Sequence, residues 1–259
     1  MLAELLRRRR ASGATSIRVL DAGCGPGTWL RRVVAHAQTL GFTSISARGF
    51  DVSQRQIRSA RFLSREQNAL PGVSLTFDVA DLEYALRERD ASVDLTLCLY
   101  SVLSHLPVAS LAEVCSEFAR VTAGHVVATV RPVGSTPTIF VDSIEKARRF
   151  QRDEQADWCD IEMENGRRIG ARFHLFEAAE LRRYFADGFE IEDLRGLDLF
   201  HGRFSPDRRW NPASVSANAQ LCGELARLED TFSTNPSFME RAAHLLLVGQ
   251  RRPGIALQT

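Results

Sequence analysis

Long hydrophobic runs are missing from this chain of 259 residues. Its longest uninterrupted apolar stretches, such as Leu245 to Val248, fall far below the roughly 18 residues that a membrane-spanning helix needs. We therefore expect no membrane span. The hydrophobic content of 44% instead fits a chain that folds around an ordinary core.

Cysteine is scarce and scattered. The five cysteines are odd in number, and no two of them are closer in sequence than Cys98 and Cys115. This spacing indicates neither a disulfide framework nor a zinc site, and no metal site is expected. A reducing, cytoplasmic location fits the pattern best.

An excess of charge of either sign is also missing. The chain has 33 Lys and Arg residues against 32 Asp and Glu residues, which gives a net charge of +1. A nucleic-acid binder would usually show a strong basic excess. We therefore expect no nucleic-acid partner, and the length allows one large domain or two small ones.

The first 16 residues have three possible interpretations. Leucines on one face precede the run Arg7 to Arg10, which is the reverse of the order in a secretory signal. An organelle transit peptide would be rich in arginine and poor in acids, and only Glu4 weakly opposes that interpretation. We favour a short solvated helix that caps the fold.

From Ser16 to Arg131 the hydrophobic pattern alternates between strand and helix periodicity. Strands separated by helices predict βαβ units and a parallel sheet. The predicted strands are Ile17–Asp21, Ala47–Val52, Val73–Val79, Val93–Leu99 and His125–Arg131, and the predicted helices are Thr28–Leu40, Ser53–Asn68 and Leu106–Val121.

After Pro132 this rhythm breaks and then resumes. Asn165-Gly166 between two alternating runs, Ile161–Glu164 and Arg167–Phe176, predicts a hairpin in which both turn residues have positive φ. The remaining predicted elements are helices at Asp142–Gln151, Glu177–Ala186 and near Ser214–Phe232, and strands at Phe189–Leu194 and His244–Gln250.

The most informative segment is a glycine-rich turn between the first strand and the first helix. Glycines at positions 23, 25 and 27 let the backbone approach a ligand closely. A dinucleotide fingerprint would need glycine at position 28, where this chain has Thr28. Asp21 would sit poorly beside a pyrophosphate and well beside a sulfonium or ammonium group. The turn therefore favours a positively charged cofactor without phosphate.

The segment Asp21-Ala22-Gly23-Cys24-Gly25-Pro26-Gly27 resembles the first motif of class I S-adenosylmethionine-dependent methyltransferases. The resemblance implies S-adenosylmethionine as cofactor, S-adenosylhomocysteine as product, and a Rossmann-like fold. It places Asp21, Gly23, Cys24, Gly25 and Gly27 at the cofactor. Cys24 also has a plainer interpretation, as a small residue packed under the turn.

Three later segments resemble the following motifs of the same family in order. Gly49 to Ser53 resembles the second-strand motif, whose acid, here Asp51 beside Val52, binds both ribose hydroxyls. Phe77 to Leu82 resembles the third, in which Asp81 and Leu82 would meet the adenine. Ser92 to Tyr100 resembles the fourth strand, so Leu99 and Tyr100 would border the cofactor. Taken singly, Asp51 and Asp81 could also be ordinary strand-end or capping carboxylates.

The resemblance and the element order together predict a fold and its division. We expect an α/β, three-layer α/β/α sandwich with a seven-stranded, mostly parallel sheet, an antiparallel last strand and lid insertions. The whole chain, 1–259, forms one domain in this interpretation. Within it, 1–16 is a cap segment, 17–131 the cofactor-binding half, and 134–176 and 196–241 the substrate-lid insertions.

Methyl transfer needs alignment of the acceptor and, where the acceptor holds a proton, a base. The candidate bases are His105, His174 and His201, with Tyr100 as a hydrogen-bond donor near the methyl group. His105 is the first choice because it follows the fourth strand. A packing or surface role is the alternative for each histidine.

The two insertions combine aromatic side chains with arginines, which suits a small organic substrate bearing a carboxylate or phosphate. Equally, the aromatics could form a satellite core and the arginines its solvated rim. The side chains concerned are Trp158, Phe173, Phe176, Phe200, Phe204 and Trp210, with Arg167, Arg168, Arg172, Arg203, Arg208 and Arg209.

These observations favour methylation of a small molecule at O, N or C by a monomer or homodimer. An RNA or protein methyltransferase is one alternative, and it would need a contiguous basic face. A non-catalytic S-adenosylmethionine-binding regulatory protein is another. A dehydrogenase that uses NAD is disfavoured by Thr28.

Overall fold

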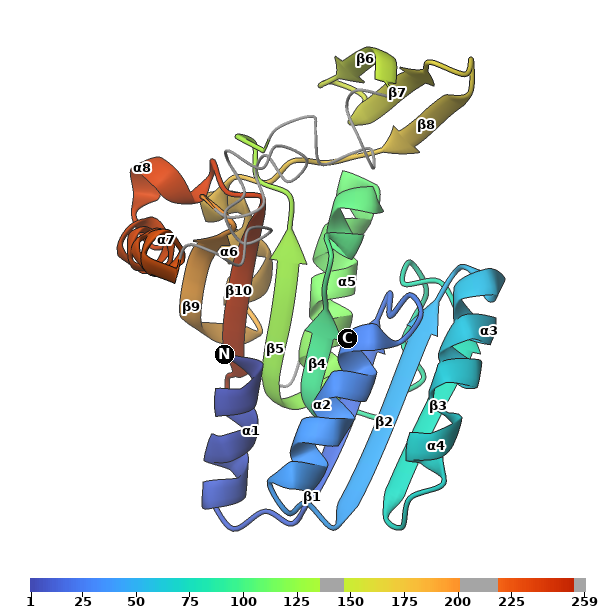
Figure 1. Cartoon of the computed structure of the whole chain (residues 1–259). Coiled ribbons are helices and arrows are strands. Elements are labelled where there is room, and N and C mark those ends of the chain that lie inside the picture. Colours follow the sequence, from blue (N-terminus) through green and yellow to red (C-terminus); the bar gives the residue numbers. More distant parts are fainter. Residues whose placement is uncertain (136–146, 201–218, 254–259) are drawn as a thin grey trace.

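A seven-stranded sheet with the order β3-β2-β1-β4-β5-β10-β9 forms the centre of the computed structural model (Figure 1). The structure describes residues 1–135, 147–200 and 219–253. The strands are β1 Ser16–Ala22, β2 Ser44–Asp51, β3 Val73–Val79, β4 Val93–Cys98, β5 Thr122–Val130, β9 Phe189–Leu197 and β10 His244–Arg251. Strands β1 to β5 are parallel, and β10 is antiparallel to β5 and β9. The predicted sheet with its antiparallel last strand is confirmed.

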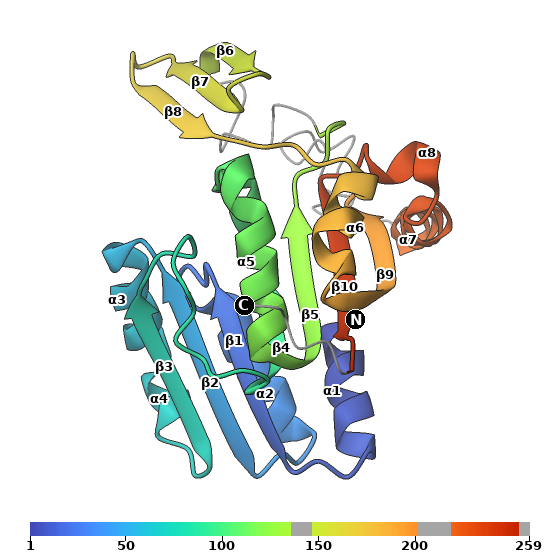
Figure 2. The same cartoon turned by 180° about the vertical axis from the view of Figure 1, so that it is seen from behind.

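Helices cover both faces of this sheet. Helices α1 Leu2–Ala11, α2 Thr28–Thr39 and α3 Gln54–Leu63 lie on one face, and α5 Val108–Val121 and α6 Ala178–Ala186 on the other (Figures 1 and 2). Each face has its own apolar cluster, with Leu30 and Val34 buried on the first side and Phe118 and Phe185 on the second. The three-layer α/β/α arrangement is thereby confirmed.

Two predicted helices begin or end differently in the structure, for local reasons. Ser53 caps α3 as expected, its side chain accepting from the Gln56 backbone N–H, but the helix stops at Leu63 and a short α4, Arg65–Asn68, follows. The helix predicted from Leu106 begins at Val108, because Pro107 keeps the residue before it extended. A 3₁₀ turn, η1 Val102–His105, precedes it.

A second, three-stranded antiparallel sheet lies beyond the edge at which β1 to β5 end (Figure 1). We call it the lid sheet: β6 Ala147–Asp153, β7 Trp158–Met163 and β8 Arg168–Arg172. The helix predicted over 142–151 is wrong for residues 147–151, which form β6, and residues 142–146 lie outside the described residues. Backbone pairing with β7 prevails there over local helix preference.

The predicted hairpin at Asn165-Gly166 is confirmed, but its turn differs from the expectation. Of these two residues only Gly166 has a positive φ, +77°. Hydrogen bonds join the Gly166 N–H to the Met163 carbonyl and the Met163 N–H to the Arg167 carbonyl. This is a three-residue loop with glycine in the left-handed position, which places one extra residue between β7 and β8.

The first residues form the short helix α1, which packs against the fold. Leu5 and Leu6 are buried, and a guanidinium nitrogen of Arg9 lies 3.0 Å from a carboxylate oxygen of the buried Asp94. The Arg18 backbone N–H also donates to Asp94. Part of the arginine run therefore anchors α1 at the edge where β4 begins.

Beyond β9, α7 Ala219–Phe232 and α8 Pro236–Met239 precede β10. Residues 214–218 of the helix predicted near Ser214–Phe232 lie outside the described residues. The remainder of that prediction agrees with α7. No described helix is long and apolar enough to cross a membrane.

Candidate active site

The glycine-rich turn lies where β1 ends, beside the end of β2. Both the Gly23 and Cys24 N–H groups donate to the Phe50 carbonyl, which fixes the turn against β2. A Cβ at Gly23 would lie 2.4 Å from Val102, whereas a Cβ at Gly25 would meet no atom within 4 Å. Both residues have left-handed φ, +72° and +51°. Gly23 is thus required by packing, while Gly25 leaves open space over the turn.

Asp51 stands at the end of β2 and joins this turn to α3. One carboxylate oxygen accepts from the Gly25 N–H at 2.9 Å and the other from the Ser53 N–H at 2.8 Å. A carboxylate has about four acceptor positions, so capacity for further donors remains. The neighbouring apolar side chains of Val52 and Val79 are 64% and 51% exposed. The site therefore pairs a fixed acceptor with uncovered apolar surface.

Asp21, the residue before the last in β1, is a buried carboxyl with only 2% exposure. Burial, and then the negative charge of Asp51, raises the pKa of Asp21 to about 7. Near neutral pH the group therefore changes between a neutral acid and a carboxylate. A cation nearby would favour the charged form.

Asp81 and Leu82 follow β3 on the same edge of the sheet. One Asp81 oxygen accepts from the Glu83 N–H at 3.0 Å, so the residue also stabilises its own turn. Leu82 is buried at 5% exposure and belongs to the core on the α5 side. The predicted positions are thus close to the edge where the β1 turn and Asp51 lie.

Cys24 has the environment of a packed thiol. Burial, then the charges of Asp21 and Asp51, raises the pKa of Cys24 far above its ordinary value. Burial likewise raises the pKa of Cys115 to about 12. Since the thiolate is the reactive form, neither group suits nucleophilic chemistry, and the plainer interpretation of Cys24 fits the geometry.

The chain makes an unusual turn directly after β4. Tyr100 and Ser101 have left-handed φ values of +58° and +63°, uncommon for residues other than glycine. The Ser101 N–H donates to the Thr129 carbonyl of β5, which holds the turn in place. As a result the Tyr100 side chain is 68% exposed at the edge of the sheet. Backbone strain of this kind is often found at functional sites.

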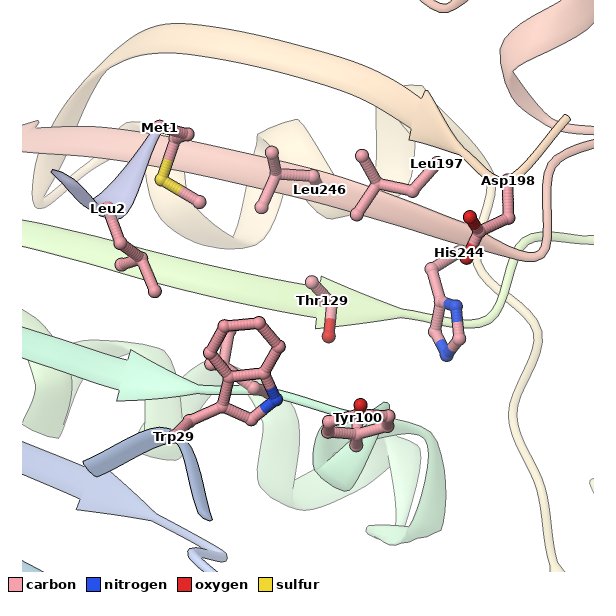
Figure 3. A pocket seen from close by; sticks show the side chains of 10 residues that line it. Met1, Leu2, Trp29, Tyr100, Thr129, Leu197, Asp198, His244 and Leu246 are labelled. Carbon is pink, nitrogen blue, oxygen red and sulfur yellow. The ribbon is translucent and has the colours of Figure 1, made fainter. Parts of the chain in front are cut away.

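A cavity of about 190 Å³ opens on one side of Tyr100, as Figure 3 shows. Three rings of its lining lie in a row. The ring centroids of Trp29 and Tyr100 are 6.4 Å apart, and those of Tyr100 and His244 are 6.2 Å apart. Burial and then the charge of Arg131 lower the pKa of His244 to about 4, so its ring is neutral at neutral pH. The other lining residues are Met1, Leu2, Leu99, Thr129, Leu197, Asp198 and Leu246.

A second cavity, of about 180 Å³, lies between Tyr100 and the lid sheet. Its polar side is formed by Ser101, His105 and Arg131 together with Tyr100. The lid sheet and the segment after it supply the apolar side, which consists of Cys159, Ile161, Ile169, Ala171 and Phe173. Tyr100 therefore borders both cavities and ends the segment that was predicted to contact the cofactor.

His105 is the predicted base that lies in this second cavity. Its Nδ1 is 3.2 Å from the carbonyl oxygen of Arg172. A carbonyl only accepts, so a hydrogen bond here requires Nδ1 to carry the proton, leaving Nε2 as the acceptor in the neutral ring. Burial, the leading cause, and the charge of Arg131 lower the pKa of His105, while the Arg172 carbonyl opposes the shift. The neutral, basic form is favoured.

His174 is held between two carboxylates instead. Its Nδ1 is 2.9 Å from Asp157, and its Nε2 is 3.1 Å from Glu180. Because Asp157 lies in the β6–β7 turn and Glu180 in α6, the ring connects the lid sheet to the main fold. Both ring nitrogens are occupied, which suits a structural contact better than proton transfer. His201 lies outside the described residues.

The aromatic and arginine side chains of the insertions divide between core and surface. Phe176 is 1% exposed and belongs to the main core, whereas Phe173 joins a small cluster with Cys159 and Leu175. Arg167, Arg168 and Arg172 are exposed. For these residues the structure favours the satellite core with a solvated rim. Phe204, Trp210, Arg203, Arg208 and Arg209 lie outside the described residues.

Sequence reasoning missed two residues that the fold brings to these cavities. Arg131 is the residue directly after β5, and His244 is the first residue of β10. Neither belongs to a motif, and their proximity to Tyr100 depends on the order of the strands. The available signal was their position at the ends of predicted strands. Within the described part of the chain, no cluster of His, Cys, Asp and Glu is arranged to hold a metal ion.

Comparison with known proteins shows what this chain is similar to. Residues 19–124 match a family model described as a methyltransferase domain. No curated protein sequence matches the chain.

Many solved structures share the fold, and three of them serve as examples. A protein from Pyrococcus horikoshii OT3 is 16% identical, with a TM-score of 0.57, over 91% of this chain and 82% of that one. Magnesium protoporphyrin IX methyltransferase from Synechocystis PCC 6803, with bound S-adenosylhomocysteine, is 18% identical, with a TM-score of 0.54, over 97% and 82%. A SAM-dependent methyltransferase from Methanosarcina mazei is 18% identical, with a TM-score of 0.52, over 90% and 91%.

Proposed function

Since residues 19–124 match a methyltransferase domain, we propose that the chain is a class I S-adenosylmethionine-dependent methyltransferase and that it methylates a small organic molecule. S-adenosylmethionine is the cofactor of this family, and when bound it supplies an electrophilic methyl group on a sulfonium sulfur. The protein's task is then to align an acceptor and to remove its proton where it holds one.

We propose that the turn between β1 and α2 and the ends of β2 and β3 hold the cofactor. The open space over Gly25 allows close approach of a ligand to the backbone. Asp51 has acceptor capacity for a ribose diol, and Val52 offers apolar surface beside it. Asp81 and Leu82 would receive the adenine, and Asp21 would face the positive charge. These residues fit a cationic nucleoside and provide no cradle of cationic side chains for a phosphate.

The observation that carries the small-molecule assignment is the placement of Tyr100 between two cavities of about 190 and 180 Å³. Volumes of this order suit a small organic group. The lid sheet covers one of them, which supports the assignment of 134–176 as a substrate lid beside a cofactor half at 17–131; a lid role for 196–241 stays a prediction.

His105 is the proposed base. Its Nε2 can take a proton from an acceptor in the cavity that it shares with Tyr100, while the Arg172 carbonyl fixes the ring through Nδ1. The Tyr100 hydroxyl would orient the acceptor. We do not propose His174 as a base, because Asp157 and Glu180 occupy its two ring nitrogens.

The direct test is equilibrium binding of S-adenosylmethionine by the full chain and by Asp51→Asn. We expect the substitution to weaken binding by about tenfold or more, because it removes a charged acceptor. Asp78→Asn is the matched control: Asp78 lies opposite Phe50 in the sheet, but Arg48 and Arg87 engage its carboxylate. Equal affinity for Asp51→Asn and the unsubstituted chain would refute the proposed cofactor site.

A further inference from the structure

The cavity under the lid sheet combines one cationic side chain with an apolar wall. Arg131 enters it from the end of β5, and Ile161, Ile169 and Phe173 face it from the lid side. A site of this composition can hold an apolar group that ends in an anion. Which anion and which orientation depend on the donors that remain available.

Two buried polar atoms of this cavity's lining residues have no hydrogen-bond partner within the described part of the chain. They are the Oγ of Ser101 and the Nε of Arg131. Ser101 itself is only 2% exposed. Burying a donor without an acceptor is costly, and more so for a charged group than for a neutral one. Both atoms belong to residues that line one small cavity, so a small rotation of either side chain would bring its donor to an external acceptor there.

Hydrogen bonds to the main fold hold the Arg131 side chain and backbone in position. Its Nη1 donates to the Ala243 carbonyl at 2.8 Å, and the Arg131 backbone N–H donates to Ser104 Oγ at 3.1 Å. The Arg131 carbonyl accepts from the Phe176 N–H, at the point where the chain returns from the lid sheet. The cation therefore sits on the junction between the main sheet and the lid.

The charge on Arg131 is incompletely compensated. Burial lowers the pKa of Arg131 to about 10, and the attraction of Asp198 only opposes that shift. The side chain is still fully charged at neutral pH. Its positive charge also lowers the pKa of His105 and of His244, so its field reaches both cavities. An anion beside Arg131 would relieve the cost of the buried charge.

From this juxtaposition we infer that Arg131 and Ser101 bind the carboxylate of a small apolar acid whose carbon skeleton packs against the lid sheet. The inference rests on the proposed function, since the acid would be the methyl acceptor or a part of it. A carboxylate matches the two-pronged geometry of a guanidinium and can accept a third hydrogen bond from a serine hydroxyl. This inference makes Arg131 a specificity-determining residue.

The test compares benzoate with benzamide, which has the same shape without the charge, on the full chain saturated with S-adenosylhomocysteine. Binding is followed by ligand-observed NMR or calorimetry. We expect benzoate to bind at least tenfold more tightly than benzamide. Arg131→Gln should abolish that preference, and Ser101→Ala should reduce it severalfold. Phenyl phosphate is included as a second anion, and we expect it to bind more weakly than benzoate.

Matched variants distinguish an effect on the binding site from an effect on folding. Arg168→Gln removes an exposed lid arginine whose side chain is 71% exposed, and it should leave the preference unchanged. Ile169→Trp keeps Arg131 but fills the cavity, so it should weaken benzoate binding even if Arg131→Gln folds poorly. Affinity for S-adenosylhomocysteine, measured on the same samples, reports both folding and the proposed cofactor site.

Equal binding of benzoate and benzamide would overturn the inference, as would a preference that survives Arg131→Gln or benzoate binding that survives Ile169→Trp. In each of these outcomes, retained affinity for S-adenosylhomocysteine would leave the methyltransferase proposal standing. Loss of that affinity in the unsubstituted chain would instead contradict the proposed function itself.

Discussion

Residues 17–131 and the lid sheet are held together by different kinds of contact. In the first region, strands β1 to β5 are covered on both faces by large clusters of buried apolar side chains. Among the described residues, the lid sheet and the segment after it share one cluster of three buried residues, and polar contacts such as the His174 bridge connect it to the rest. A packed core resists local opening, while a region with few buried contacts opens at low cost. Residues 17–131 are thus expected to be the more rigid region and the lid sheet the region that opens more easily.

The largest expected effect comes from replacing one buried phenylalanine by alanine in each of the two cores. Phe176→Ala should lower the free energy of unfolding by about 3–5 kcal/mol, because the ring is buried in the main core. Phe173→Ala, in the three-residue cluster, should cost less than about half as much. Thermal and denaturant unfolding measure both. Equal losses of unfolding free energy would mean that the lid sheet and the main sheet unfold as one unit, which would contradict the difference described above.

Next in size is the contact that bridges the two regions. His174→Gln cannot satisfy Asp157 and Glu180 together, so the lid amides should become easier to open by about 1–3 kcal/mol. Hydrogen exchange of β7 and β8 amides is the measurement, with the β1 amides as reference. His125→Gln, at a histidine that lies 3.6 Å from Glu192 away from the lid, is the control. Unchanged exchange in β7 and β8 would show that other contacts hold the lid sheet.

Two glycines of the turn after β1 distinguish a packing role from a ligand-binding role within residues 17–131. Gly23→Ala should destabilise the fold, because its Cβ would overlap Val102. Gly25→Ala meets no protein atom, so beyond about 1 kcal/mol of backbone strain its effect should fall on S-adenosylmethionine affinity, by about tenfold or more. Unfolding temperature and equilibrium binding, measured for both variants, distinguish the two effects. Full affinity in Gly25→Ala would show that the ligand does not approach this part of the turn.

The last expected effect concerns pH and Asp21. Its pKa rises from 3.8 to about 7 on burial, so the folded protein keeps a proton that the unfolded chain releases between these values. Stability without ligand should therefore fall as pH rises from about 4 to 7. Affinity for the cationic S-adenosylmethionine should rise over the upper part of that window, by up to about tenfold per pH unit, and level off above 7.

Asp21→Asn should flatten both pH profiles. Binding titrations and denaturant unfolding between pH 5 and 8 provide the data. An affinity profile that stays as steep in the variant would assign the pH dependence to another group.

The sequence was sufficient to predict the fold of residues 17–131 because its signals are local. The strand and helix periods and the glycine spacing lie within short segments, and Ser53 caps its helix through a contact three residues away. Val73–Val79 was predicted to the residue. The acid positions at Asp51 and Asp81 follow from strand ends in the same way, and their assignment to a ligand stays a prediction.

The structure after Pro132 was harder to predict from the sequence. It depends on contacts between distant segments, which a local pattern does not contain. Residues 147–151 have no strand signal of their own and become β6 through pairing with β7. Arg131 and His244 meet the Tyr100 turn because β10 inserts between β5 and β9. The pairing of His174 with Asp157 and Glu180 likewise depends on how the lid segment folds back. Such positions become visible only when the strand order is known.

The left-handed turn at Tyr100 and Ser101 also limits how the protein can diversify. It borders both cavities and directly follows the strand expected to contact the cofactor, and β5 holds its backbone through Thr129. A substitution there would alter cofactor contact and both cavities at once, and few side chains tolerate the backbone angles. Ile161, Ile169 and Ala171 belong to strands that end in solvent-facing loops and touch only one cavity. A lineage that changes its substrate would therefore be expected to vary β7 and β8 first and to leave the turn after β4 untouched.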